Sequence, residues 1–405
     1  MVAWDPSLEQ DFGIIARGQN VGLGTTSGYV LTLDVDEAAI YLSRLDNEAA
    51  ATLAKVELIM DVGKTYRFRL SAIGNKISAG VSEADAPGEE LVILEAEEED
   101  GYTEGVNGFF TNSGVESNEC AIKLARKHGG RGRHTIVSTL GSFHGRTLAT
   151  LAATGQPTKH EPFQPMPAGF HHVPWGDIDA IRAAVDGSVA AVLIEPIQGE
   201  GGVHPATAEY FRAVREICDD AGALMMVDEI QTGFARTGRW FGFEHTGISP
   251  DVVTLAKAMG NGMPVGACWA RTDVAAVFEP GDHGSTYSGT AIACSAVNAV
   301  IDEMQRLDAP ALAERKGAHL VDGLRALHGV IGVRGAGLML GVELAEGLDA
   351  KQAYVDLLDA GLIVNAVSPT TIRLLPPLTV SDDELDEAIA MIDDALNVQL
   401  HEADA

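Results

Sequence analysis

Cysteine, basic residues and long apolar runs are all scarce in this chain of 405 residues. The four cysteines (Cys120, Cys218, Cys268 and Cys294) are widely separated and form no CxxC pair, which argues against a disulfide framework and a structural zinc site. No apolar run approaches the ~18 residues that a membrane helix requires, and the first residues lack the basic-then-apolar pattern of a secretory signal. We therefore expect a soluble, cytoplasmic protein without a membrane partner.

The shortage of positive charge is also informative. Lysine and arginine number 28 against 58 aspartates and glutamates, so the formal charge is −30. Such a surface repels phosphate backbones, and we expect no nucleic-acid partner. Hydrophobic residues at 46% and charged residues at 21% are ordinary values for a chain that buries a core. His144 and His283 stand in no spacing that matches a metal site, so we expect no metal.

The pattern of apolar and polar residues divides the chain into three zones, and we expect domains at 1–107, 108–307 and 308–405. The first zone is atypical and hard to interpret, and its acidic run EAEEED at 95–100 reads as a solvated loop or helix face. In the middle zone, the apolar runs 189–194 and 223–227 are typical of buried parallel strands. An amphipathic helix over 207–221, with Thr207 as its N-cap, joins them into a strand–helix–strand unit.

The last zone predicts a smaller α/β arrangement. Short strands are expected at 338–342 and 362–364. Ser381 and Glu384 form a capping box that begins the final helix. The fold class is therefore α/β, with a large domain built on a mostly parallel sheet and a smaller α/β domain.

Two side chains of the middle zone could take part in catalysis or ligand binding. Asp228 directly follows the strand at 223–227, and ligands of parallel sheets bind beyond the carboxyl ends of strands. Taken alone, it is more simply a helix cap or an ion-pair partner. Lys257 lies among small and apolar residues, where it could extend to solvent or be desolvated into a nucleophilic amine. An amine of that kind together with a buried carboxylate suggests an imine-forming cofactor.

Two segments could hold a phosphate group. TNSGVE at 111–116 opens a helix, where free backbone N–H groups can bind an anion. GSTYSG at 284–289 is a second loop rich in hydroxyl groups and glycine, again followed by a helix. Each signal is weak alone, because many helices begin this way and bind nothing.

Taken together and in order, these segments resemble the class III (subgroup II) pyridoxal-phosphate-dependent aminotransferases. The resemblance rests on NSGVE at 112–116, FHGRT at 143–147, EPIQGEGG at 195–202, DEIQTG at 228–233, Lys257 and GST at 284–286. It extends from about 109 to 396 and is greatest to the acetylornithine/ornithine branch. The segments TGQP at 154–157 and PFQPMP at 162–167 are similar to acetylornithine enzymes of actinobacteria.

The resemblance implies a fold type I transferase with a seven-stranded large-domain sheet, and pyridoxal 5′-phosphate as the cofactor. Lys257 would bind the cofactor aldehyde and move the proton during transfer, and Asp228 would pair with the pyridine nitrogen. Gln231 would bond the phenolic oxygen, and Phe143 would stack on the ring. The remaining cofactor contacts that it implies are Ser113, Gly114, Val115, Ser285 and Thr286. Because Thr286 would reach the phosphate of a neighbouring subunit, the resemblance also implies a homodimer.

For the substrates, the resemblance implies that Arg146 and Arg373 grip carboxylates. Glu200 would pair with Arg373 while a terminal amine is bound and release it for 2-oxoglutarate. The implied reaction transfers the terminal amino group of N2-acetylornithine to 2-oxoglutarate, in arginine biosynthesis. Ornithine, 4-aminobutyrate and succinyl-diaminopimelate are alternative amino donors. A non-catalytic cofactor-binding homologue is an alternative of a different class, and decarboxylase, mutase or racemase chemistry on the same scaffold is a third.

The first hundred residues depart from the family pattern. Relatives carry a short β-meander and a Gly-His-x-His-Pro turn here, in a region that lines the substrate tunnel and contributes to the small domain. This chain has no such turn, and LDVDE at 33–37 is at most weakly similar to the meander.

Overall fold

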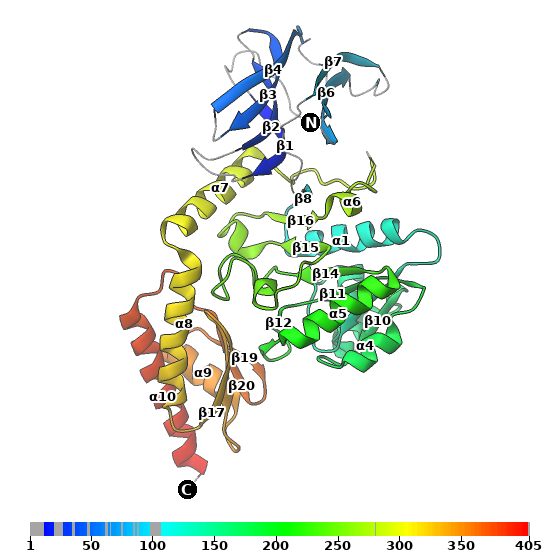
Figure 1. Ribbon diagram of the computed structural model, residues 1–405. Helices are drawn as coiled ribbons and strands as arrows, with labels where there is room; N and C mark the ends of the chain where they lie inside the picture. Colours follow the sequence, from blue (N-terminus) through cyan, green and yellow to red (C-terminus); the bar gives the residue numbers. More distant parts are fainter. Residues whose placement is uncertain are drawn as a thin grey trace. The chain divides into compact units, whose positions relative to one another are not determined.

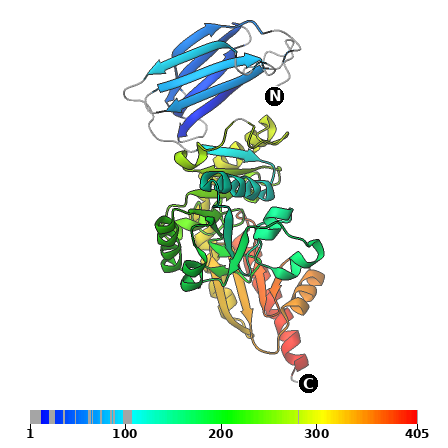
Figure 2. The same ribbon diagram turned by 90° about the vertical axis from the view of Figure 1, so that its right-hand side faces the viewer.

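The computed structural model describes residues 12–19, 27–34, 37–46, 49–60, 64, 66–73, 76–83, 86, 89–97, 107–279 and 281–403. By its internal contacts the chain separates into two compact units, 1–107 and 108–405. Figures 1 and 2 show the ribbon of both units. Among the described residues no helix is both long enough and apolar enough to cross a bilayer.

The first unit is built from antiparallel strands in two sheets. One sheet has the order β1 (Phe12–Gln19), β2 (Ser27–Asp34), β3 (Ala39–Asp46), β4 (Ala49–Glu57), and the other has β5 (Tyr66–Ile73), β6 (Lys76–Glu83), β7 (Glu90–Glu97). Alternate residues such as Leu31 and Leu33 on β2, and Ile77 and Ala79 on β6, are buried in a single cluster. Because that cluster takes residues from both sheets, the two sheets share one core.

The interpretation of 95–100 as a loop or helix face is wrong for the residues that the structure describes. Glu95 and Glu97 belong to strand β7 and are exposed, whereas Val92 and Leu94 on the opposite face are buried. The acidic side chains therefore occupy the solvent face of a strand, as its period of two residues requires. The rest of the run, 98–100, lies outside the described residues. So does part of the segment 33–37, which is weakly similar to the meander of relatives.

The second unit contains the predicted sheet. Its seven strands have the order β10 (Phe170–Val173), β9 (Thr135–Thr139), β11 (Val189–Ile194), β14 (Leu224–Asp228), β15 (Val252–Leu255), β16 (Gly266–Ala270), β8 (Asn107–Thr111). The pairs from β10 to β15 are parallel, and β15 with β16 is antiparallel. The fold is therefore the α/β class with a mostly parallel seven-stranded sheet that the sequence predicts. Strands β11 and β14 are buried along their whole length, which explains why both read as continuous apolar runs.

Helices cover both faces of this sheet (Figure 1). Those between Gly114 and Arg306 are α1 (Gly114–Gly129), α2 (Leu148–Ala153), α3 (Pro157–His160), α4 (Ile178–Ala184), α5 (Ala208–Ala221), α6 (Thr272–Ala275) and α7 (Ala291–Arg306). Short 3-10 turns occur at η1 (Glu161–Phe163), η2 (Gly242–His245) and η3 (Lys257–Met259), and a two-stranded pair is formed by β12 (Ile197–Gln198) and β13 (His204–Pro205). The predicted helix over 207–221 is confirmed: Thr207 Oγ1 accepts a hydrogen bond from the Tyr210 backbone N–H at 3.1 Å.

After α7, a second layer forms from an antiparallel sheet and three helices. The sheet order is β17 (Val330–Ala336), β18 (Met339–Leu344), β20 (Thr371–Leu374), β19 (Asn365–Ser368), and the helices are α8 (Ala309–Arg325), α9 (Ala350–Ala360) and α10 (Asp382–Ala403). The capping box at Ser381 and Glu384 is confirmed, with the Ser381 N–H donating to Glu384 Oε2 at 2.7 Å. This layer has its own buried cluster, which includes Leu320, Val342 and Ile392.

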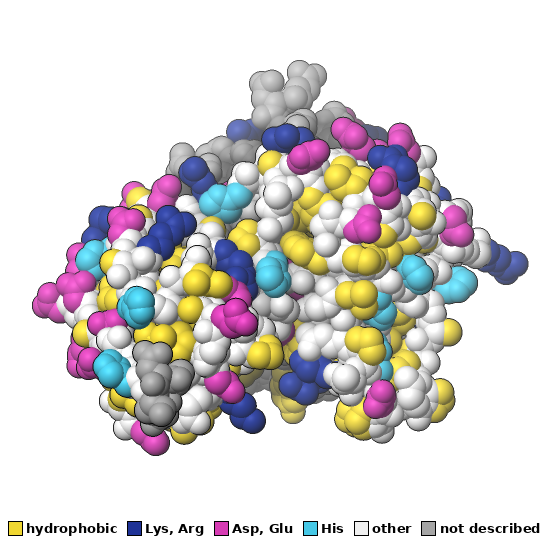
Figure 3. All heavy atoms as spheres, turned by 90° about the horizontal axis from the view of Figure 1, so that it is seen from below, with side chains coloured by type: hydrophobic (Ala, Val, Ile, Leu, Met, Phe, Trp, Pro, Cys, Tyr) yellow, Lys and Arg dark blue, Asp and Glu magenta, His cyan; other side chains and the backbone are white. Residues whose placement is uncertain are grey.

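The strand predicted at 362–364 is wrong by about three residues. The Leu362 N–H donates to the carbonyl of Leu357 at 2.8 Å, so these residues close the end of α9. Strand β19 begins only at Asn365. Figure 3 shows that acidic, basic and apolar side chains are interspersed on the face of the molecule that it presents.

Candidate active site

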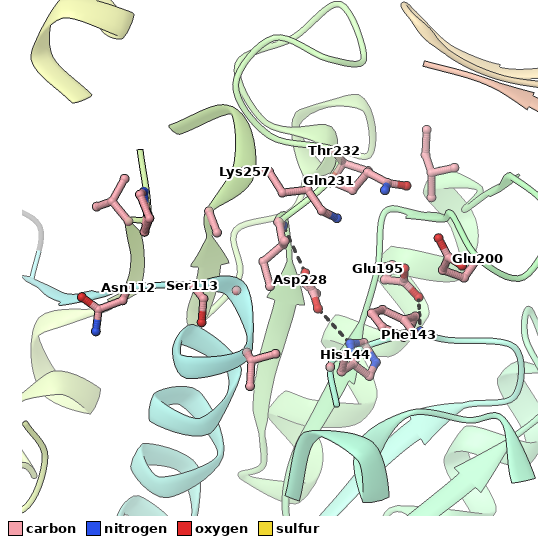
Figure 4. A pocket seen from close by; sticks show the side chains of 18 of the residues that line it. Asn112, Ser113, Phe143, His144, Glu195, Glu200, Asp228, Gln231, Thr232 and Lys257 are labelled. Carbon is pink, nitrogen blue, oxygen red and sulfur yellow. Dashed lines mark hydrogen bonds and ion pairs between the residues drawn. The ribbon is translucent and has the colours of Figure 1, made fainter. Parts of the chain in front are cut away.

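A cavity of about 530 Å³ lies in the second unit, next to strand β14 and the residues that follow β15. Asp228 ends β14, and Lys257 comes two residues after β15; the two strands are parallel neighbours. Both side chains line this one cavity (Figure 4). The sheet therefore brings an acid and an amine together although they lie far apart in the sequence.

Asp228 is buried and held by three hydrogen bonds. Its Oδ2 accepts from Asn118 Nδ2 at 2.8 Å and from His144 Nδ1 at 2.9 Å. Its Oδ1 accepts from the Ile230 N–H at 3.1 Å. A carboxylate fixed in this way can present a negative charge to a ligand without reorganising. The reading of Asp228 as a simple helix cap does not fit these contacts.

Lys257 occupies a backbone conformation with φ +47°, which is unusual for a residue with a side chain. Strain of this kind is found most often at functional positions. Its side chain reaches solvent through the cavity, yet burial by the surrounding protein lowers the pKa of the amine. Asp228 and Glu195 partly oppose that shift by favouring the ammonium form, and Arg373 adds to it. Both sequence interpretations therefore describe part of what is seen: the side chain opens to solvent through the cavity, and the surrounding protein also desolvates its amine.

The N-terminus of α1 faces the same cavity. Ser113 is the N-cap, and its Oγ accepts from the Glu116 N–H at 3.4 Å. Gly114 and Val115 begin the helix and line the cavity with Ser113. A Cβ atom at Gly114 would come within 2.8 Å of Ile230 Cδ1, so the close approach of this turn requires glycine. A helix of 16 residues gives this end free N–H groups and a partial positive charge suited to a phosphate group.

Phe143, Gln231 and Glu200 complete the predicted lining. The Phe143 N–H donates to Glu195 Oε2 at 3.3 Å (Figure 4). Arg373 does not line the cavity itself, but its Nη1 pairs with Glu200 Oε1 at 2.8 Å and donates to Gln231 Oε1 at 3.4 Å. The Glu200–Arg373 pair implied by the sequence is therefore present in this structure.

Besides Arg373, three more predicted residues lie outside the cavity lining. Arg146 is exposed, and its Cζ lies 5.7 Å from the centroid of the Phe143 ring, beside the cavity. Ser285 and Thr286 are also exposed. Ser285 Oγ accepts from Asn112 Nδ2 at 2.7 Å, which joins its loop to the edge of the site. Thr286 does not reach the cavity of its own chain.

Sequence reasoning missed several residues of the site. Asn112 and Glu195 line the cavity, and Asn118 and His144 hold Asp228. His144 was set aside because it fitted no metal site, although its place directly after Phe143 was a usable signal. The Glu195 carboxyl is fully buried, and burial raises its pKa to about 7. Glu229, next to Asp228, is buried in the same way and its pKa is also raised to about 7.

This combination of sheet, helix N-terminus, buried acid and desolvated amine defines a site for a phosphorylated carbonyl cofactor on a doubly wound α/β fold. The chain belongs to the class III aminotransferases, whose family model matches residues 89–396. It is 47% identical over 298 residues to an acetylornithine aminotransferase of Caldanaerobacter subterraneus, covering 71% of this chain and 75% of that protein. An acetylornithine aminotransferase of Methanopyrus kandleri is 48% identical over 289 residues, covering 71% and 74%.

Solved structures agree with this assignment. The ornithine aminotransferase of Toxoplasma gondii superposes with a TM-score of 0.70 at 30% identity and covers 74% of each chain. An (S)-enantioselective ω-transaminase of Thermomicrobium roseum gives a TM-score of 0.68 at 31% identity, covering 73% of this chain and 75% of that one. The protein is thus a transaminase whose cofactor is pyridoxal 5′-phosphate, as the sequence predicts.

The residues present fit that cofactor. The free N–H groups of α1 suit its phosphate group, the Asp228 carboxylate suits a protonated ring nitrogen, and the Lys257 amine suits its aldehyde. The Phe143 side chain, on the same cavity, offers an aromatic face for the ring.

Proposed function

We propose that this chain transfers the terminal amino group of N2-acetylornithine to 2-oxoglutarate, giving N-acetylglutamate 5-semialdehyde and glutamate in arginine biosynthesis. The observation that carries the proposal is the Glu200–Arg373 pair at 2.8 Å on the cavity that also holds Lys257 and Asp228. Relatives named acetylornithine aminotransferase, which are 43–48% identical to this chain, support the choice of donor.

In this reaction the bound cofactor supplies an electron-withdrawing ring that stabilises negative charge at the substrate carbon bearing the amino group. Lys257 Nζ, as a neutral amine, would accept the proton released from that carbon and would become neutral again when it gives the proton up. Desolvation lowers the pKa of this amine and so increases the fraction that is neutral. Asp228, fixed by Asn118 and His144, would hold the protonated ring nitrogen of that cofactor.

Glu200 and Arg373 let one site accept two differently charged substrates. While they are paired, the charge of the guanidinium is neutralised, and this end of the site suits an amino donor without a carboxylate there. When 2-oxoglutarate enters, the carboxylate next to its keto group would replace Glu200 on Arg373, and the planar guanidinium can hold it in bidentate geometry. Arg146, whose Cζ lies 5.7 Å from the centroid of the Phe143 ring, would bind the distal carboxylate.

The working unit would be a homodimer in the cytoplasm. Thr286 is exposed and lies off the cavity of its own chain, in accord with a role in the site of a neighbouring subunit. Tyr287, next to Thr286, has 75% of its surface accessible, and Ile292, in the first turn of α7, has 67%. Large exposed apolar side chains of this kind are typical of contact surfaces. Analytical ultracentrifugation tests the dimer, and a monomer at working concentration would refute it.

The proposal is tested by measuring kcat/KM for four amino donors with 2-oxoglutarate: N2-acetylornithine, ornithine, 4-aminobutyrate and succinyl-diaminopimelate. We expect N2-acetylornithine to have the highest value. A clear preference for another donor would reassign the substrate, and absence of turnover with all four would favour the non-catalytic homologue. Borohydride reduction followed by peptide mapping should place a pyridoxyl group on Lys257, and the Lys257→Ala variant should carry none.

A further inference from the structure

A second cation lies beside Arg146 on the ring of Phe143. Lys159 Nζ is 4.9 Å from the ring centroid, and Arg146 Cζ is 5.7 Å from the same centroid. Neither cation lines the cavity itself, but Phe143 does, and the charge of Glu200, another lining residue, acts on Lys159. Lys159 stands on the short helix α3 and belongs to none of the motifs that carry the resemblance.

The position of Lys159 is set by the backbone around it. The Gly141 N–H donates to the carbonyl of Gly155 at 2.8 Å, and Gln156 Nε2 donates to the carbonyl of Ser142 at 2.9 Å. These bonds join the residues just before Phe143 to the residues just before α3. The lysine is therefore held over the ring by a connected framework and does not depend on a long free loop.

Neither cation has a carboxylate partner. Within the described part of the chain, the side chains of Lys159 and Arg146 make no ion pair and no hydrogen bond beyond their contact with the aromatic ring. Lys159 is half-buried, and desolvation lowers the pKa of its amine, while the charge of Glu200 opposes that shift and the charge of Arg146 adds to it. The positive charge of Arg146 acts unfavourably on the partly buried Lys159, and an anion bound next to both would relieve that repulsion.

We propose that Lys159 is a specificity-determining residue: with Arg146 it forms a cationic pair around Phe143 that binds the carboxylate at the non-reacting end of the amino donor. The pair would favour donors that carry a carboxylate there over otherwise identical amines. This inference rests on the proposed function, since it concerns the donor of that reaction. A purely structural alternative is that Lys159 only stabilises the Phe143 ring through its cation–π contact.

The two explanations differ in how they depend on the donor. N-Acetylputrescine has the acetamido group and terminal amine of N2-acetylornithine but lacks its carboxylate. In Lys159→Met, we expect kcat/KM for N2-acetylornithine to fall about tenfold, mainly through a higher KM, since charge-assisted contacts of this kind are worth roughly one such factor. The value for N-acetylputrescine should change less than about twofold. Lys159→Arg, which keeps the charge, should retain most of the wild-type value.

Lys351→Met is the matched control, because Lys351 is an exposed lysine on α9. It should leave kcat/KM for both donors unchanged. An equal loss for both donors in Lys159→Met would favour the structural role and overturn the proposal, and so would the absence of any change.

A binding measurement separates this inference from the proposed function. N-Acetylnorvaline carries the carboxylate but no terminal amine, so it cannot react. By calorimetry we expect its Kd to rise about tenfold in Lys159→Met and to be unchanged in Lys351→Met. If wild-type protein fails to turn over N2-acetylornithine, the proposed function is wrong, yet this shift in Kd would still support an anion site at Lys159. A Kd that is the same in both variants, or wild-type protein that does not bind N-acetylnorvaline, refutes the inference.

Discussion

His144 donates from Nδ1 to Asp228 Oδ2 over 2.9 Å, and both side chains are buried. Because an ionised carboxylate can only accept, the proton of the ring lies on Nδ1. The other ring nitrogen, Nε2, is buried and has no partner among the described residues. The histidine thus directs its one hydrogen bond to the acid that faces the cofactor site.

Replacing this histidine should therefore weaken catalysis without preventing folding. In His144→Asn we expect kcat to fall about tenfold or more, because Asp228 Oδ2 would keep only the bond from Asn118. The KM for 2-oxoglutarate should change little, since His144 does not contact Arg373 or Glu200. Steady-state kinetics measures both, and His171→Asn, at an exposed histidine, serves as the control. An unchanged kcat would show that His144 contributes nothing to the role of Asp228.

The Glu200–Arg373 pair predicts a different response from the two substrates. Arg373→Gln should raise the KM for 2-oxoglutarate about tenfold or more, because a charge-assisted carboxylate contact is lost. The KM for the amino donor should rise much less, since Arg373 is neutralised by Glu200 while the donor is bound. Initial rates with each substrate varied in turn measure both constants. Equal increases for the two substrates would contradict the exchange of partners on Arg373.

Glu229 predicts a pH dependence of stability. Its carboxylate accepts from the backbone N–H groups of Gly242 and Phe243 at 2.9 and 2.8 Å, and burial raises its pKa from 4.5 to about 7. Since the folded state binds this proton more tightly than the unfolded state, the group's contribution is full below pH 4.5 and is lost as the pH rises to about 7.

The Glu229→Gln variant removes this titration. The free energy of unfolding of wild type minus that of the variant should therefore fall by ~3 kcal/mol between pH 4.5 and pH 7.5. Urea denaturation at a series of pH values measures it. Glu216→Gln, at an exposed position on α5, should give a flat difference. A flat difference for Glu229→Gln as well would mean that this carboxyl titrates normally.

Gly155 predicts a steric cost. A Cβ atom there would come within 2.0 Å of the carbonyl oxygen of Thr139, a backbone atom that cannot easily move. Gly155→Ala should therefore destabilise the protein by roughly 2–4 kcal/mol, seen as a lower midpoint in thermal unfolding. Gly187→Ala is the control, because a Cβ at that exposed glycine meets nothing within 4 Å. Equal midpoints for the two variants would contradict the close approach of these two segments.

The structural features that the sequence predicts well depend on a few neighbouring residues or on a pattern that repeats along one element. The caps at Thr207 and Ser381 act over three residues, and β11 and β14 are buried on both faces, so their apolar runs are visible without knowledge of their neighbours. The prediction of a strand at 362–364 was wrong because these residues close the end of α9. In the sequence, an apolar pair after a helix looks the same whether it closes the helix or begins a strand.

What the sequence does not predict depends on contacts between distant segments. Asn118 meets Asp228 across 110 positions, and Glu195 meets Phe143 across 52. No local pattern encodes such pairs. The two-sheet unit before residue 108 was missed for the same reason: alternation on β2 and β6 is present, but only pairing between strands makes it a shared core.

The neighbouring strands β14 and β15 have one further consequence. Asp228 lies opposite Thr254 on the adjacent strand, about 4.8 Å away as neighbouring strands are, and Lys257 follows Thr254 by three residues, so strand pairing and not the connecting segment sets how the acid and the amine are placed. The connecting segment around η2 is therefore free to change its length or sequence during evolution, provided that it keeps the partners of Glu229. The relative position of the acid and the amine would stay the same. With the pairing of the two strands fixed in this way, a family can vary its substrates while the reacting groups keep their positions.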